Sequence, residues 1–159
     1  MNGATLKTLR EALCLPVSWL AAVCGVQERT VRYWEAGTVA VPQDVADQIE
    51  QLEMLAAVLT EQVVSSVRQQ VAEHGDPGEP IRLVRYAEAE DMARFQPELA
   101  TLPPTFHAAI IARIRWALEP DGLVVEAHNL NVPAYMAWLK ATSQKESPAA
   151  RAQFIASGD

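Results

Sequence analysis

The sequence predicts a mainly α-helical protein, with an N-terminal head of four to five helices, a long connecting helix and a small C-terminal α+β region with two short strands. Apolar residues recur at steps of three and four from residue 4 onward, which is the period of an amphipathic helix. One apolar stripe continues from Pro42 to Gly75 with no internal Gly or Pro, and it predicts a long helix. Only the runs IRLVRY at 81–86 and LVVEAHN at 123–129 are predicted as strands.

The head is predicted to contain helices at 4–14, about 17–24 and about 28–36, with Leu15-Pro16 separating the first two. Gly25 tolerates a left-handed backbone, so the second helix stops sharply there and the third leaves at a steep angle, which is a helix-turn-helix. The positions predicted to face inward are Leu20, Cys24, Val26, Val31 and Trp34.

The outer side of the third helix is predicted to be polar. It carries Gln27, Glu28, Arg29, Thr30, Arg32 and Tyr33. These are hydrogen-bond donors, an acceptor and an aromatic ring, which suit contacts with base edges and phosphates of DNA.

Within that set, Arg29 and Arg32 are the predicted base-reading residues, because an arginine makes two hydrogen bonds to guanine. The alternative for each is a phosphate contact or an ion pair with Glu28. Glu28 itself either accepts a hydrogen bond from cytosine or orients a neighbouring arginine. Tyr33 either contacts a thymine methyl or a phosphate, or leans on its own helix. The residues placed for phosphate contacts are Gln27, Thr30 and, in the following loop, Thr38.

The long helix after Pro42 should exceed what the head can cover, so we expect it to project, or to break once, and to carry the second half of the chain. Further helices are expected at 88–94, 104–118 and from Asn131 to about 142. The two strands should pair with each other on the helices or extend across a dimer axis. In the polar tail, Ser147-Pro148 could begin one more short helix, with fraying as the alternative.

Three regions follow from this pattern. They are a helix-turn-helix domain at 1–60, a long-helix continuation with an α+β dimerisation or partner region at 61–142, and a tail at 143–159 that is a short helix or disordered. Trp116 and Trp138 are expected in the core or a dimer interface rather than in a ligand pocket.

Composition limits the possible functions. Half of the 159 residues are hydrophobic, which predicts a packed core. No stretch approaches the roughly 20 apolar residues of a membrane span, and no signal peptide is evident, so a cytoplasmic location is expected. Cys14 and Cys24 are predicted as small core residues, with a redox pair as the alternative. The three histidines are far apart in sequence, so we expect neither a metal nor a cofactor.

The net charge of −7 is unevenly distributed. Residues 1–42 hold four basic and three acidic side chains, whereas residues 43–76 hold one arginine and seven acids. The acidic charge therefore lies mainly outside the predicted DNA-binding helix. A globally acidic protein has little sequence-independent affinity for DNA, which suits a selective regulator.

From Leu6 to Leu55 the chain resembles the Cro/C1 (xenobiotic-response-element) class of helix-turn-helix proteins. The ending WEAG at 34–37 after VQERTVRY is similar to that family's recognition helix. The resemblance implies a structural ion pair between Arg10 and Glu35. The longer pattern, with AVP and a long helix following, resembles bacterial or phage anti-CRISPR-associated autorepressors.

The chain also departs from the Cro/C1 pattern. Pro16 and Val17 replace the usual side-chain cap and glutamine at the start of the second helix, and Trp19 stands where a polar residue is common. We expect Trp19 to pack on the C-terminal half, with a contact to DNA or a partner as the alternative.

These observations predict a sequence-specific, double-stranded DNA-binding transcriptional regulator, acting as a homodimeric autorepressor on a palindromic operator. The alternative is an antitoxin-like or protein-interaction module whose C-terminal region binds a partner protein. An enzyme is not expected, because no nucleophile–base pair, metal set or phosphate-binding loop is visible.

Overall fold

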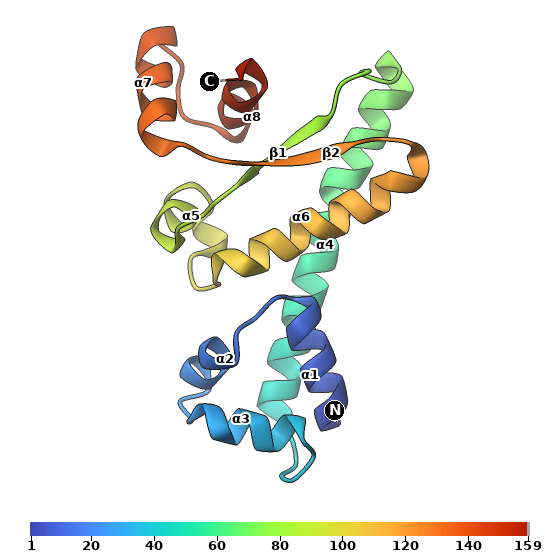
Figure 1. Cartoon of the computed structure of the whole chain (residues 1–159), viewed down its shortest axis with the longest axis vertical. Helices are drawn as coiled ribbons and strands as arrows, with labels where there is room; N and C mark the ends of the chain where they lie inside the picture. Colours follow the sequence, from blue (N-terminus) through green and yellow to red (C-terminus); the bar gives the residue numbers. More distant parts are fainter. Residues whose placement is uncertain (159) are drawn as a thin grey trace.

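The computed structural model describes residues 1–158, and in that part of the chain eight α-helices and two strands confirm the predicted fold class (Figure 1). The N-terminal elements are α1 (Gly3–Ala12), α2 (Val17–Val23), α3 (Glu28–Glu35) and α4 (Gln43–His74). The remaining elements are β1 (Ile81–Arg85), α5 (Ala89–Phe95), α6 (Pro104–Leu118), β2 (Val125–Asn129), α7 (Val132–Thr142) and α8 (Pro148–Ser157), with short 3₁₀ turns η1 (Pro97–Leu99) and η2 (Glu119–Asp121).

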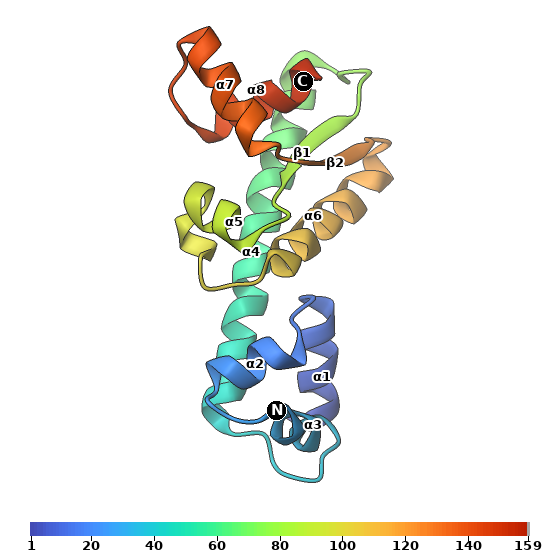
Figure 2. The same ribbon diagram turned by 60° about the vertical axis from the view of Figure 1, so that its left-hand side comes forward.

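The long helix α4 is the axis of the molecule. Its 32 residues span about 48 Å at 1.5 Å per residue. It begins directly after Pro42 and ends at Gly75, whose φ of 85° stops the helix. Figures 1 and 2 show α1–α3 around one end of α4 and the strands and later helices along the other. The helix therefore projects from the head without a break. The boundary that we predict at residue 60 falls inside it and stays a prediction.

Helix α1 is shorter than the predicted 4–14. After Ala12 the chain reverses at Cys14, which adopts φ 51°, and the Leu15 amide donates to the Arg10 carbonyl at 3.0 Å. This is the hydrogen-bonding pattern of a Schellman C-cap. The reversal turns Cys14 to the surface, so the prediction that it faces the core was wrong.

Cys24 is half-buried and packs against the core of the head, which agrees better with the predicted inward position than the exposed Cys14 does. Burial, and to a lesser extent the charge of Asp44, raises the pKa of its thiol. A thiol held protonated is a poor nucleophile and metal ligand, which fits a packing role.

The contact between α1 and α3 depends on a glycine that the sequence pattern did not single out. A Cβ on Gly3 would lie 2.0 Å from the carbonyl oxygen of Trp34 and 2.8 Å from that of Glu35. Both are backbone atoms that cannot move without shifting α3. Gly3 thus lets the start of one helix lie directly against the end of the other.

The two strands pair with each other, in parallel, with Ile81 opposite Val125 and Arg85 opposite Asn129. Parallel pairing requires a crossover, which α5, η1 and α6 provide. Helix α6 packs on β2, and α8 packs on β1. The small sheet is consequently held between helices, as one of the two predicted arrangements requires.

Helices α7 and α8 enclose an aromatic cluster. Tyr135 and Phe154 are fully buried, with ring centroids 5.4 Å apart, and Trp138 lies 5.8 Å from Phe154. The Ser147 hydroxyl caps α8 by accepting from the Ala150 amide. The tail is therefore a packed helix through Ser157, and the alternative of fraying was wrong.

Helix α6 packs against the apolar stripe on α4. One ion pair joins the two helices, since Arg113 of α6 binds Glu53 of α4 through two hydrogen bonds of 2.8 and 3.1 Å. A second joins α4 to the η2 turn after α6, where Arg68 lies 2.8 Å from Asp121. The stripe residues that are half-buried here are Leu52, Leu55, Leu59, Val63, Val67 and Val71. The apolar stripe of α4 thus packs against other elements of the same chain.

The tryptophans differ in environment. Trp116 on α6 is 66% exposed, so it does not belong to the core, whereas Trp138 is half-buried in the aromatic cluster. Trp19 is also half-buried, and its indole N–H donates to the Thr101 carbonyl at 3.1 Å. The prediction that Trp19 packs on the C-terminal half is confirmed. No helix within residues 1–158 has the length and hydropathy needed to cross a membrane.

Candidate nucleic-acid interface

The turn between α2 and α3 is built around Gly25. Its φ is 64°, and the Val26 amide donates back to the Ala21 carbonyl at 2.9 Å. Leu20 and Ala21 are buried where the two helices meet. The small side chain at position 21 and the left-handed glycine together set the angle at which α3 leaves.

Helix α3 is fixed to the head by its inner side and closed at its end by a second glycine. Val31 is fully buried, and Trp34 is 5% exposed. After the helix, Gly37 adopts φ 72°, and the Thr38 amide donates to the Tyr33 carbonyl at 3.0 Å. The helix cannot rotate about its axis without exposing Trp34, so its outer face has a defined direction.

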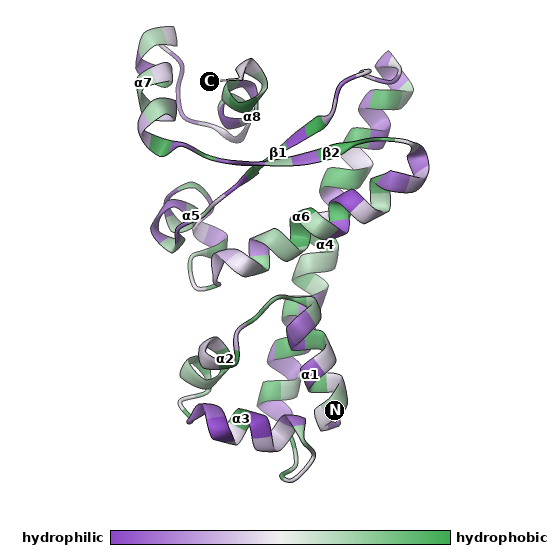
Figure 3. Cartoon of the chain, viewed as in Figure 1, coloured by the Kyte–Doolittle hydropathy of each residue, from purple (hydrophilic) through white to green (hydrophobic). Residues whose placement is uncertain are grey.

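The outer face of α3 lies at one end of the molecule, away from the sheet (Figures 1 and 2). Figure 3 shows that this helix consists mainly of hydrophilic residues. The predicted contact residues that are exposed are Gln27, Glu28, Arg29, Arg32, Tyr33 and Thr38, while Thr30 is half-buried. The structure therefore gathers all seven at the surface of the head, six of them freely accessible.

Two charged residues of this face pair with each other. Arg32 lies 3.3 Å from Glu28, one helical turn away, and their side chains are 64% and 50% exposed. Such an exposed pair contributes less than about 1 kcal/mol, so it can open when a phosphate or base competes. Within residues 1–158, Arg29 has no ion-pair partner, and its guanidinium is available.

Behind the face, Arg10 joins three parts of the head. Its Nε lies 2.5 Å from Glu35 of α3, and both side chains are less than 10% exposed. Its Nη1 donates to the Leu15 carbonyl at 2.8 Å in the α1–α2 turn. The ion pair implied by the family resemblance is thus present. The Leu15 contact was not foreseen, because a side chain to backbone bond leaves no pattern in the sequence.

The start of α2 lacks a side-chain cap, as expected from Pro16 at that position. Instead, Trp19 ties this helix to the segment that follows η1, through the Thr101 carbonyl. Trp19, which stands where the Cro/C1 family often has a polar residue, thus connects the head to the C-terminal half of this protein.

The fold and this surface define a class: a helix-turn-helix head whose second helix presents a polar, arginine-bearing face, attached to a separate helical body. A family model described as Aca2/YdiL-like matches residues 1–120. The chain belongs to the Aca2/YdiL-like family, a helix-turn-helix regulator family associated with anti-CRISPR genes. No curated protein matches the sequence significantly. The family assignment indicates a regulatory, DNA-binding role, and the match ends before β2, α7 and α8.

Proposed function

We propose that this protein is a Cro/C1-type transcriptional regulator that binds double-stranded DNA sequence-specifically by inserting α3 into the major groove. The observation that supports this most is the outer face of α3, where exposed Arg29, Arg32 and Tyr33 are held in one direction by buried Val31 and Trp34. A rigid helix with accessible donors is what direct base recognition requires.

In this proposal Arg29 and Arg32 bind guanines, and Glu28 orients the Arg32 side chain before DNA binds. Gln27, Thr30 and Thr38 lie next to the arginines and supply phosphate contacts that fix the position of the helix. The acidic residues concentrated on α4 reduce binding to unrelated DNA, because they lower the number of phosphates that the protein can neutralise.

We further propose a homodimer that binds a palindromic operator and represses its own gene in the cytoplasm. One head contacts only a few base pairs, and two-fold symmetry doubles the contacts. The apolar stripe of α4 no longer argues for a dimer, because its residues already pack against the core of the same chain. Exposed apolar side chains now support this proposal, namely Trp116 (66%), Met54 (60%), Val58 (53%) and Val124 (60%).

A second candidate is an antitoxin-like module whose C-terminal region binds a partner protein. The exposed Trp116 favours it, since it lies in a surface hollow with Arg115 and the β2 residues Val125 and Ala127. Aromatic side chains with an adjacent arginine are common at the centre of protein interfaces. In both candidates the protein is a binding protein without catalytic function or cofactor.

A gel shift with the DNA upstream of the protein's own gene tests the leading proposal. We expect a discrete complex on that fragment and none on a scrambled fragment of equal length at the same salt concentration. Complex formation only after addition of a protein from a neighbouring gene would favour the second candidate instead. Equal binding to both fragments would contradict sequence-specific recognition.

A further inference from the structure

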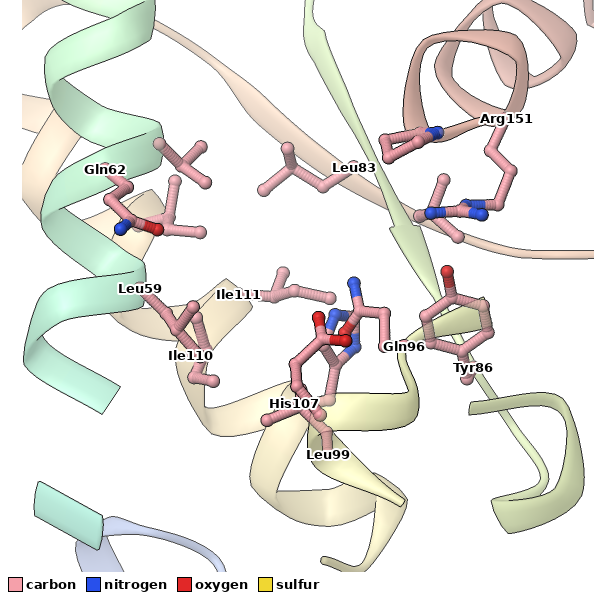
Figure 4. A pocket seen from close by; sticks show the side chains of 15 residues that line it. Leu59, Gln62, Leu83, Tyr86, Gln96, Leu99, His107, Ile110, Ile111 and Arg151 are labelled. Carbon is pink, nitrogen blue, oxygen red and sulfur yellow. The ribbon is translucent and has the colours of Figure 1, made fainter. Parts of the chain in front are cut away.

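A cavity of about 220 Å³ lies in the C-terminal half, between α4, β1, η1, α6 and α8. Figure 4 shows Leu59 and Ile110 on one side of it, together with the amide of Gln62. Polar side chains of Tyr86, His107 and Arg151 gather on the other side. The cavity is thus amphipathic, with one mainly apolar wall and one hydrogen-bonding wall.

Two polar atoms in the second wall lack a partner. In the part of the chain that is described, the Tyr86 hydroxyl and the His107 Nδ1 are buried and have no hydrogen-bond partner. The two residues are 1% and 8% exposed, and their rings lie 5.2 Å apart. Native proteins satisfy most buried polar groups, so two orphans in one wall indicate a partner from outside the chain.

The polar wall disfavours net charge. Burial, assisted by the charge of Arg85, lowers the pKa of His107 to about 4, and burial raises the pKa of Tyr86 to about 12. Both groups are therefore neutral at neutral pH. Arg151 is already paired with Glu146. An anionic ligand would lose its hydration here without gaining a free positive charge. For a cationic ligand, the one lining carboxylate, Glu98, is exposed, so its charge is screened by solvent.

The volume limits the size of the ligand. An engineered apolar protein cavity of about 150 Å³ binds benzene, so this larger cavity has room for one ring and a small substituent. We propose that the cavity binds a small, uncharged, mainly apolar molecule with a single ring and one hydroxyl or carbonyl group, hydrogen-bonded by Tyr86 and His107.

Such a ligand would lie close to the segment that holds the head. Glu98 and Leu99 of η1 line the cavity, and two residues later the Thr101 carbonyl accepts the hydrogen bond from Trp19 of α2. A ligand that moves η1 would therefore change the position of the DNA-binding head. This regulatory consequence rests on the proposed function, whereas ligand binding itself does not.

Titration of the full chain with p-cresol, toluene and p-toluate, followed by NMR, tests the proposal. All three probes have one methylated benzene ring. In addition, p-cresol carries a hydroxyl group, toluene carries no polar group, and p-toluate carries a negative charge. We expect p-cresol to bind at least several-fold more tightly than toluene, and p-toluate not to bind. Tyr86→Phe should weaken p-cresol several-fold, leave toluene unchanged and leave the melting temperature of the free protein at or above that of wild type, because it removes an unpartnered hydroxyl.

A cavity-filling pair of variants locates the site. Val63→Phe on α4 adds a ring to a residue that lines the cavity, whereas Val67→Phe, one turn further, lines a different hollow. Val63→Phe should abolish p-cresol binding and Val67→Phe should retain it. Absence of p-cresol binding at millimolar concentration, equal binding by both phenylalanine variants, or p-toluate binding as well as p-cresol would overturn the proposal.

A parallel measurement of operator affinity addresses regulation. Saturating p-cresol should change the affinity of wild type several-fold and leave that of Val63→Phe unchanged. Binding of p-cresol with no change in operator affinity would overturn the regulatory link and leave the site in place. A failure of the protein to bind any operator would overturn the proposed function and not the site, since the NMR titration contains no DNA.

Discussion

Arg10 is the residue at which α1, α3 and the α1–α2 turn meet. Its guanidinium binds the Glu35 carboxylate and the Leu15 carbonyl, and it is almost completely buried. A buried ion pair is costly to break on one side, because the remaining charge stays desolvated. Arg10 therefore maintains the head, and it contributes to recognition only by holding α3 in place.

Arg10→Ala and Glu35→Ala should each lower the free energy of unfolding by about 3–5 kcal/mol. Urea denaturation followed by circular dichroism measures this loss. Arg68→Ala is the matched control, because its pair with Asp121 is about half exposed and should contribute at most about 1 kcal/mol. An Arg10 variant that unfolds like wild type but prefers a different operator would show that this arginine contacts DNA.

His107 should make stability depend on pH. Its folded-state pKa of about 4 lies below the ordinary value of 6.5, so the unfolded chain takes up a proton first as the pH falls. The contribution of neutral His107 to the free energy of unfolding is therefore fully present above about pH 6.5 and is lost as the pH falls from 6.5 to 4. At about pH 5 the loss amounts to about 2 kcal/mol. His107→Gln should remove this part of the acid sensitivity, measured as the difference in unfolding free energy between about pH 7 and pH 5. The control His128→Gln, at a half-buried position on β2, should retain it.

At the scale of single residues, the sequence correctly predicted burial where it follows from helical periodicity. It did not predict the residues whose position depends on a local chain reversal or on a close contact between helices. Val31 and Trp34 are buried as their spacing requires. Cys14 was misplaced because α1 ends at Ala12, two residues before the predicted end, and the backbone reverses at Cys14. Gly3 was overlooked because its role depends on a carbonyl of α3, which no one-dimensional pattern contains.

Helix α8 shows how tertiary contacts decide whether a segment is ordered. Its sequence is polar enough to fray, yet Phe154 and Ile155 are buried against α7 and β1. Helix propensity alone is marginal for ten residues, so packing of this one face stabilises the helix. The order of the tail could not be predicted without knowing that Tyr135 and Trp138 form a surface for it.

Phe154→Ala should therefore destabilise the C-terminal half strongly. Removing a fully buried phenylalanine costs about 3–5 kcal/mol, and exposed Gln153→Ala on the same helix should change stability by less than about 0.5 kcal/mol. Thermal unfolding monitored by near-UV circular dichroism of the aromatic cluster measures both. If Phe154→Ala melts with wild type, the helix does not pack on the body in solution.

The pairing of the strands was only partly predictable at this scale. Two strands were expected to pair, and they do, but their parallel direction follows from the crossover through α5 and α6. The bounds of α6 agree with the predicted 104–118, because prolines and the PDG turn delimit that helix. The sequence is sufficient to predict the end of a helix that Pro or Gly delimits. It is not sufficient to predict the direction of strand pairing or the order of a segment that depends on packing against another element.

For the whole molecule, the proposed dimer is the feature that most affects recognition. Sedimentation at micromolar concentration should give twice the chain mass of 17.4 kDa. Trp116→Glu should shift the protein toward the monomer, because it places a charge on a large exposed apolar side chain, whereas Lys140→Ala, with the same change in net charge, should not. A wild-type monomer would remove the basis for a palindromic operator.

The central claim is that α3 recognises a specific sequence through Arg29 and Arg32. The most direct test is fluorescence anisotropy of wild type, Arg29→Ala, Arg32→Ala and the control Lys140→Ala, on operator and scrambled duplexes at several salt concentrations. In a dimer each arginine variant should lose roughly 2–6 kcal/mol on the operator and little on scrambled DNA, and Lys140→Ala should retain the wild-type preference. If both arginine variants keep that preference, or lose affinity equally on all sequences with a reduced salt dependence, α3 does not recognise the bases.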